Sequence, residues 1–149
     1  MERSVGLQQM RIIYGALLAA VPMYIVVGEK IARRRREPLE LDVTLLAVLA
    51  ALALGSGLSG FWFRQRCLVQ ARSCWQTDTK TALNRWRAGH LVMIACAEAV
   101  VLYGMITRVL GAGLRQAGLF YVAGLVLLGL AWPKPVVSAG DSFTGSQQI

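Results

Sequence analysis

The residue best suited to take part in chemistry is Glu98, which places a single carboxyl group within the apolar stretch from Met93 to Ile106. A helical span that begins near Ala88 places Glu98 roughly 15 Å along its axis, close to the midplane of a hydrocarbon layer about 30 Å thick. An ionised carboxylate without a partner at that depth costs several kcal/mol. We therefore expect Glu98 to hold a proton or to be paired within the bundle, which makes it a candidate proton-binding or ion-binding residue.

Two oxygen atoms are predicted as partners for a protonated Glu98. Pro22 lacks an N–H group, so the carbonyl of Leu18, one helical turn earlier, loses its usual donor. An alignment of the first and third apolar stretches, which pairs Tyr24 with Tyr103, puts Leu18 next to the depth of Glu98 and hints at a duplicated two-helix unit. Ser56 also lies near mid-depth and is the alternative acceptor.

The composition of the chain is that of an integral membrane protein. Of 149 residues, 56% are hydrophobic, and the mean hydropathy is +0.51, which is too apolar for an ordinary soluble domain. The formal net charge is +8, but the basic residues lie between the apolar stretches and not on one soluble face. Contact with anionic lipid explains this pattern better than binding to nucleic acid. We expect the protein in the inner (plasma) membrane of a bacterium.

The hydropathy pattern predicts an all-α bundle of four transmembrane helices. The expected spans cover about residues 12–28, 43–63, 88–107 and 117–132. Apolar residues at helical spacing continue from residue 64 to 89, with a break and an N-cap at Thr77 and Asp78. The second and third helices should therefore extend beyond the bilayer as a hairpin, followed at the end of the chain by a disordered tail over residues 136–149.

Two further groups of residues are predicted to make contacts. Small side chains recur at every fourth position of the second span, which predicts a central packing helix that others approach closely; these are Ala47, Ala51, Gly55 and Ser59. Consecutive arginines follow the first span and are candidates for binding lipid headgroups, with a role in setting membrane orientation as the alternative; these are Arg33, Arg34, Arg35 and Arg36. We expect the termini on the cytoplasmic side.

The sequence predicts neither a metal site nor a cofactor nor an enzyme. The three cysteines, Cys67, Cys74 and Cys96, lack the spacing of a zinc site or of a disulfide framework. The single histidine, His90, stands at the start of the third span, where an interfacial hydrogen-bonding role is expected. The chain contains no zinc-protease motif, nucleophile elbow or phosphate-binding glycine loop.

A short segment of the third span resembles a known family. Ala97-Glu98 followed by Leu102-Tyr103-Gly104 and Ile106 is similar to the ion-carrying helix of rotary ATPase proteolipids, the subunit c family. In that family the glutamate binds a proton or sodium ion. The resemblance implies that Glu98 is the ion-binding carboxylate and that Tyr103 and Gly104 belong to its packing frame. The corresponding loop is longer here, and another span follows, so the resemblance implies the local chemistry and not membership of a rotor ring.

Two functions follow as expectations. The first is a non-enzymatic integral membrane protein that contacts lipid and assembles with itself or within a larger membrane complex. The alternative is a small proton-coupled transporter or proton-handling component with Glu98 as the carrier. Chain length favours the first, because four short helices rarely enclose a gated pathway alone.

Overall fold

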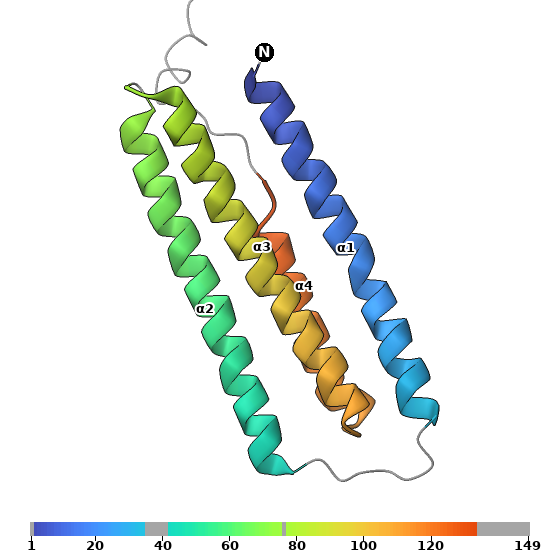
Figure 1. The fold of residues 1–149 in the computed structure, drawn as a ribbon. Helices are drawn as coiled ribbons and strands as arrows, with labels where there is room; N and C mark the ends of the chain where they lie inside the picture. The colour runs from blue at the N-terminus through green and yellow to red at the C-terminus, as the bar shows by residue number, and fades with distance from the viewer. Residues whose placement is uncertain (1, 35–41, 76, 134–149) are drawn as a thin grey trace, which may run out of the picture.

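The computed structural model describes residues 2–34, 42–75 and 77–133, and this part of the chain forms four helices (Figure 1). They are α1 (Glu2–Arg34), α2 (Val43–Cys74), α3 (Thr79–Val109) and α4 (Leu114–Leu130). Helices α1 and α3 run in one direction, and α2 and α4 run in the other. The predicted all-α bundle is confirmed.

Among the described residues, three helices are long and apolar enough to cross a membrane, over Gln8–Arg34, Val43–Cys74 and Thr79–Val109. Helix α4, with 17 residues, is about 25 Å long at the helical rise. Large aliphatic side chains lie on the outside of the bundle, for example Leu54 and Leu58 of α2, which are 68% and 71% exposed. An apolar outer surface of this extent is typical of contact with lipid.

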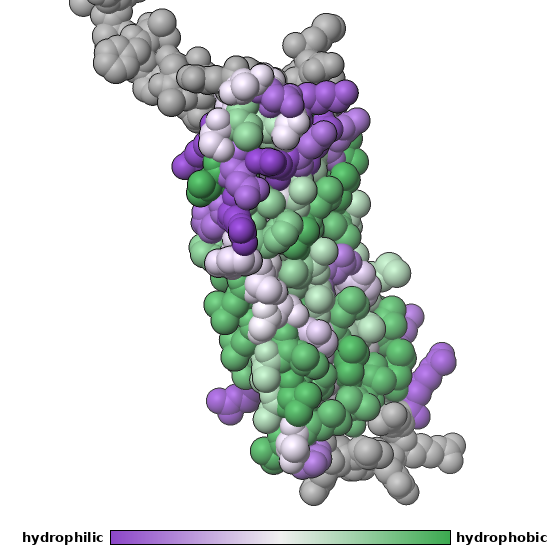
Figure 2. All heavy atoms as spheres, turned by 60° about the vertical axis from the view of Figure 1, so that its left-hand side comes forward, coloured by the Kyte–Doolittle hydropathy of each residue, from purple (hydrophilic) through white to green (hydrophobic). Residues whose placement is uncertain are grey.

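The two ends of the bundle differ from its middle. We call the end with the turn between α2 and α3 the hairpin end, and the opposite end the Arg108 end. The start of α1 lies at the hairpin end (Figure 1). In the face shown in Figure 2, hydrophilic residues gather at the hairpin end and hydrophobic residues cover most of the remainder. This distribution fits a bundle whose middle lies in lipid and whose hairpin reaches water.

Asp78 begins α3, as its sequence position predicts. Its Oδ1 accepts hydrogen bonds from the backbone N–H groups of Lys80 and Thr81, each at 3.1 Å, and its Oδ2 accepts one from the Thr81 hydroxyl. The bond from the Thr81 side chain, followed by that from its backbone, lowers the pKa of the Asp78 carboxyl. The cap is therefore ionised at neutral pH, and it lets α3 start only a few residues after α2 ends.

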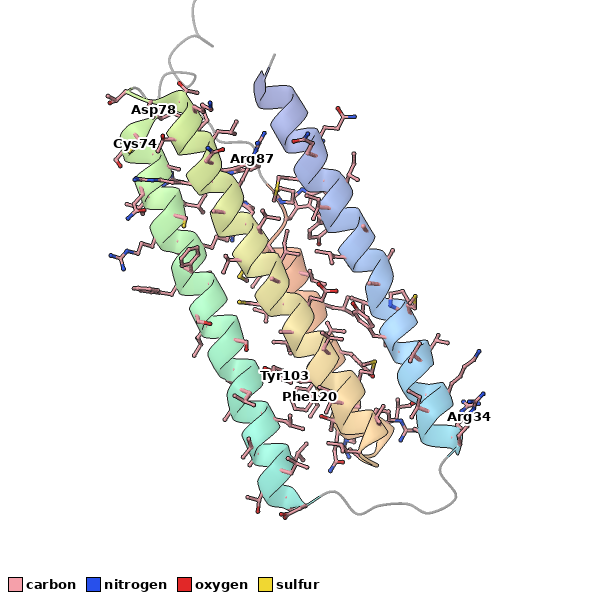
Figure 3. The ribbon with its side chains drawn as sticks, viewed as in Figure 1. Arg34, Cys74, Asp78, Arg87, Tyr103 and Phe120 are labelled. Atoms are coloured by element: carbon pink, nitrogen blue, oxygen red, sulfur yellow. The ribbon has the colours of Figure 1, made fainter. Side chains whose placement is uncertain are left out.

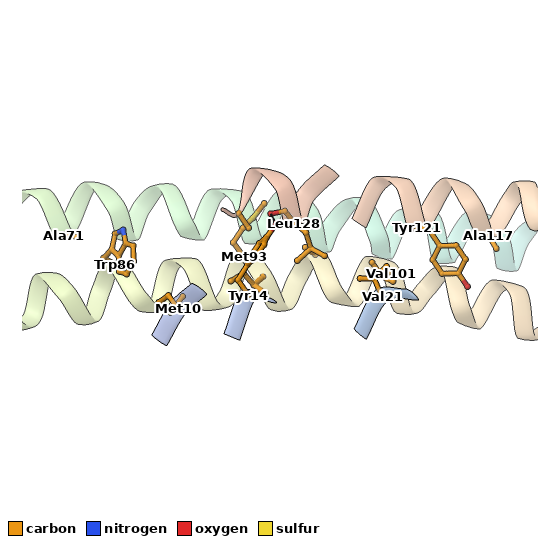
Figure 4. Close-up of a cluster of buried hydrophobic side chains, with 13 residues drawn as sticks. Met10, Tyr14, Val21, Ala71, Trp86, Met93, Val101, Ala117, Tyr121 and Leu128 are labelled. Atoms are coloured by element: carbon orange, nitrogen blue, oxygen red, sulfur yellow. Dashed lines mark hydrogen bonds between the residues drawn. The ribbon is translucent and has the colours of Figure 1, made fainter. Parts of the chain in front are cut away.

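Helix α3 occupies the centre of the bundle and packs against each of the other three helices. The expectation that the second span is the central helix is wrong. Glycines allow the close approaches: a Cβ atom on Gly60 of α2 would lie 2.7 Å from Cys96 Cβ, and one on Gly104 of α3 would lie 2.9 Å from the ring of Tyr121 on α4. Figure 4 shows the resulting apolar core along α3.

The predicted stripe of small residues on α2 lies on the outside of the bundle, because Ala47, Ala51, Gly55 and Ser59 are all exposed. The buried face of α2 instead includes Leu49, Ala53, Gly57 and Gly60. This helix has small residues on more than one face, so their spacing alone did not identify the face that meets α3. The four stripe residues are thus not packing positions within this chain.

Other predicted segments lie at the limits of the described residues. Arg33 and Arg34 are exposed in the last turn of α1 at the Arg108 end, where Figure 3 labels Arg34. Arg35, Arg36 and the predicted tail over residues 136–149 lie outside the described residues. Helix α1 continues through Pro22 without a break.

Candidate functional site

The candidate site is a set of polar contacts between α1 and α3, with Glu98 at its inner end. Glu98 lies on α3 and is half-buried, and its Oε1 accepts a hydrogen bond from the hydroxyl of Tyr24 on α1 at 2.7 Å. Because both residues lie within candidate membrane spans, this bond joins two helices in the apolar part of the bundle. The expectation that Glu98 is paired across the bundle is met, with a partner that was not predicted.

The partners predicted for Glu98 lie elsewhere. The described residues show no hydrogen bond between Glu98 and the carbonyl of Leu18, whose side chain is 40% exposed. They show none between Glu98 and Ser56 either; the carbonyl of Ser56 accepts from the hydroxyl of Ser59 within α2 at 3.0 Å. Both predictions relied on depth in the membrane, whereas the direction of each side chain around its helix decides which groups meet.

Tyr103 also lies away from Glu98. It packs beside the apolar cluster of Leu49, Ala53, Val100 and Phe120, and Figure 3 shows Tyr103 and Phe120 close together. Tyr103 follows Glu98 by five residues, which turns its side chain towards a different face of α3. Gly104, the next residue of the proteolipid-like segment, makes room for the Tyr121 ring of α4. These two residues support helix packing and do not contact the carboxyl group.

A second polar contact joins α1 and α3 at the Arg108 end. Arg108 donates from Nε to Glu29 Oε1 at 2.6 Å and from a terminal nitrogen to Glu29 Oε2 at 3.1 Å. Its other terminal nitrogen donates to the carbonyl of Ala112 at 2.9 Å. Both charged side chains are 21% exposed. This bidentate ion pair, together with the bond to Ala112, connects α1, the end of α3 and the turn before α4.

Tyr121 of α4 lies between these two contacts. The residue is 5% exposed, and its hydroxyl is buried without a hydrogen-bond partner among the described residues. It lies 3.3 Å from the position that a Cβ would take on Gly28 of α1, which follows Tyr24 by one helical turn. It is also within electrostatic range of Glu29 and Arg108. A buried hydroxyl of this kind requires a physical explanation.

His90 lies near the hairpin end and is 1% exposed. Its Nδ1 is 2.9 Å from the carbonyl of Trp86, one turn earlier on α3. The predicted hydrogen-bonding role is therefore supported, although the ring is in the core and not at an exposed interface. Its distance along α3 from Glu98 is about 12 Å, so the two groups do not form one site.

The polar contacts can bind and transfer protons more readily than they can hold a metal. In the described part of the chain, no group of three or more His, Cys, Asp or Glu side chains is placed to bind a metal ion. A carboxyl group and a phenol at hydrogen-bond distance can share or exchange a proton, because each oxygen can act as donor or acceptor according to its protonation state.

Sequence reasoning missed Tyr24, Glu29, Arg108 and Tyr121 as members of this site. The signal for Glu29 and Arg108 was present: they carry opposite charges and are related by the same alignment of the first and third spans that pairs Tyr24 with Tyr103. No comparable signal existed for Tyr121, because its contact with the site depends on how α4 packs against α3.

Comparison with known proteins assigns neither a family nor a function to these contacts. The chain matches no protein-family model, no curated protein and no solved structure.

Proposed function

We propose that the protein is a non-enzymatic integral membrane protein in which Glu98 binds and releases a proton, and that it acts as one component of a larger membrane assembly. The hydrogen bond from Tyr24 to Glu98 carries this proposal. In an apolar surrounding, a carboxyl group is retained at a cost in stability, and this cost is typical of residues that handle protons or ions.

The phenol of Tyr24 suits both protonation states of Glu98. Its O–H donates to Glu98 Oε1 at 2.7 Å, which suits an ionised carboxylate, and its oxygen can accept a hydrogen bond when the carboxyl group carries a proton. The partner therefore lowers the cost of holding either state at this depth. Glu98 is also half-buried, so it is not sealed inside the packed core of the bundle.

Membership of a larger assembly is proposed because α3 fills the centre of the described bundle. Helices packed around a central helix do not surround a pore, and Glu98 lies at the rim of the bundle beside α1. A second copy of the chain, or another membrane subunit, would then shield Glu98 from lipid and complete a pathway. The local resemblance to rotary ATPase proteolipids supports the same chemistry at Glu98.

Replacement of Glu98 by Gln tests this function. Glutamine keeps the shape and the hydrogen bond from Tyr24 but carries no exchangeable acid proton. We expect E98Q to assemble as the wild type does in mild detergent and to abolish the proton permeability that the wild-type assembly, purified together with its partners, gives to membrane vesicles. Vesicles loaded with a pH-sensitive dye report that permeability.

Asp42→Asn is the matched control, since Asp42 is an exposed carboxyl at the start of α2 whose Oδ1 caps Thr44 at 3.1 Å. D42N should keep the wild-type permeability. Normal assembly together with unchanged permeability in E98Q would show that Glu98 has a structural role and would overturn the proposal.

A further inference from the structure

The polar groups near Glu98 are distributed unequally along the bundle. Towards the Arg108 end, the hydroxyls of Tyr24 and Tyr121 and the ion pair of Glu29 and Arg108 follow one another over about 15 Å, the helical rise between Glu98 and Arg108. All four residues line the region where α1, α3 and α4 meet. The carboxyl group is thus connected by spaced polar groups to one end of the molecule.

The opposite direction is apolar. From Glu98 towards the hairpin end, the core of α3 contains Ile94 and Met93, which are both fully buried. The next hydroxyl, that of Tyr14, already donates to the carbonyl of Leu128 at 3.0 Å. Figure 4 shows Met93 in this part of the core, Val21 beside Val101, and Tyr121 on the other side of Val101. Towards the hairpin end, His90 Nε2 is a buried atom without a hydrogen-bond partner among the described residues, about 12 Å from Glu98 along α3 and separated from it by Met93 and Ile94. Towards the Arg108 end, the corresponding buried atom is the hydroxyl of Tyr121.

Tyr121 is the group in this series whose position packing alone does not explain. Its ring fills the space above Gly104, a role that phenylalanine would fill equally well. The buried hydroxyl gains no hydrogen bond among the described residues, and a buried polar group that is left unpaired destabilises the fold. It lies 3.3 Å from the position that a Cβ would take on Gly28, one helical turn after Tyr24, so the absence of a side chain at Gly28 is what admits the hydroxyl against α1.

We infer that protons reach Glu98 from the Arg108 end, with the hydroxyls of Tyr121 and Tyr24 as successive relay groups bridged by water. This inference rests on the proposed function of Glu98. Each phenol accepts a proton on its oxygen as it passes its own proton inward, and Tyr24 delivers a proton to the Glu98 carboxylate. Only O–H bonds are made and broken, and one positive charge moves from solvent to Glu98. The ion pair of Glu29 and Arg108 holds α1 against α3 at the mouth of this path.

Tyr121→Phe tests the path, because the substitution removes only the unpaired hydroxyl and should leave thermal stability unchanged or slightly raised. The readout is the infrared C=O band of protonated Glu98, assigned by its loss in E98Q. After rapid transfer to deuterated buffer, we expect Y121F to slow the deuterium shift of this band several-fold. Tyr14→Phe, which removes a hydroxyl on the hairpin side, should leave the rate as in the wild type.

The possible results distinguish an error in the proton path from an error in the proposed function of Glu98. A Glu98 band that titrates normally and exchanges at the wild-type rate in Y121F would overturn the path while the proposed function stands. Slowing in Y14F that equals or exceeds the slowing in Y121F would also overturn it, because protons would then enter from the hairpin end. The absence of any protonated Glu98 band in the wild type, at every pH at which the protein is folded, would overturn the proposed function and the path with it.

Discussion

At the scale of single residues, two acidic side chains of the described bundle have partners on a neighbouring helix. Glu98 is paired with Tyr24, and Glu29 is paired with Arg108. The two pairs differ in kind: the first joins an acid to a neutral phenol, and the second joins opposite charges through two hydrogen bonds. An ion pair joined by two hydrogen bonds holds its two helices in a fixed arrangement, whereas a phenol can stay hydrogen-bonded to a carboxyl group in either protonation state of that group.

Glu29→Gln should destabilise the protein by about 2 kcal/mol, the usual cost of losing charged hydrogen bonds in a partly buried pair. The neutral amide would leave the Arg108 guanidinium without its counter-charge at the end of α3. Arg33→Gln is the matched control, because Arg33 also approaches Glu29, at 3.8 Å, but is 82% exposed; its effect should stay within about 0.5 kcal/mol. Unfolding in detergent measures both, and equal effects would contradict the assigned role of Arg108.

At the scale of helices, glycines determine where α3 and its neighbours come into contact. A Cβ atom on Gly124 of α4 would collide with Val101 Cγ2 and lie 3.1 Å from the backbone of α3 at Ala97 O and Val101 N. Gly118 of the same helix has no atom within 4 Å of that position. The two glycines are alike in sequence context but differ in their contacts, which provides a matched comparison.

Gly124→Ala should destabilise the bundle by about 1–3 kcal/mol, because the backbone of α3 must move to admit the methyl group. Gly118→Ala should be neutral or stabilising by up to about 1 kcal/mol, since alanine favours the helix and meets open space. The midpoint of thermal unfolding in detergent distinguishes the two variants. A stabilising Gly124→Ala would mean that α4 does not pack against α3 at Ala97.

At the scale of the whole molecule, the antiparallel order of the helices fixes which segments share a side of the membrane. The start of α1 and the turn between α2 and α3 lie at the hairpin end, and the end of α1 lies at the Arg108 end. Basic residues occur at both ends of the bundle. Their distribution therefore does not decide which end faces the cytoplasm.

Single cysteines in a background without the native thiols test this arrangement. In intact cells, Gln9→Cys and Thr77→Cys should react alike with a membrane-impermeant maleimide, and Arg34→Cys should behave oppositely. Cytoplasmic termini, as the sequence analysis expects, would make only the Arg34→Cys variant react. Opposite labelling of Gln9→Cys and Thr77→Cys would contradict an α1 that spans the membrane parallel to α3.

The sequence by itself predicted the membrane class, the four helices and the cap at Asp78, and it singled out Glu98 as a carboxyl group within an apolar helix, because hydropathy and capping are properties of local segments. Only the tertiary structure decided that α3 is central, that the stripe from Ala47 to Ser59 faces outward, and that Tyr24 is the partner of Glu98. These outcomes depend on the rotation of each helix about its axis. In a membrane helix that is apolar on every side, the hydrophobic pattern leaves that rotation open, and close contacts at a few glycines set it.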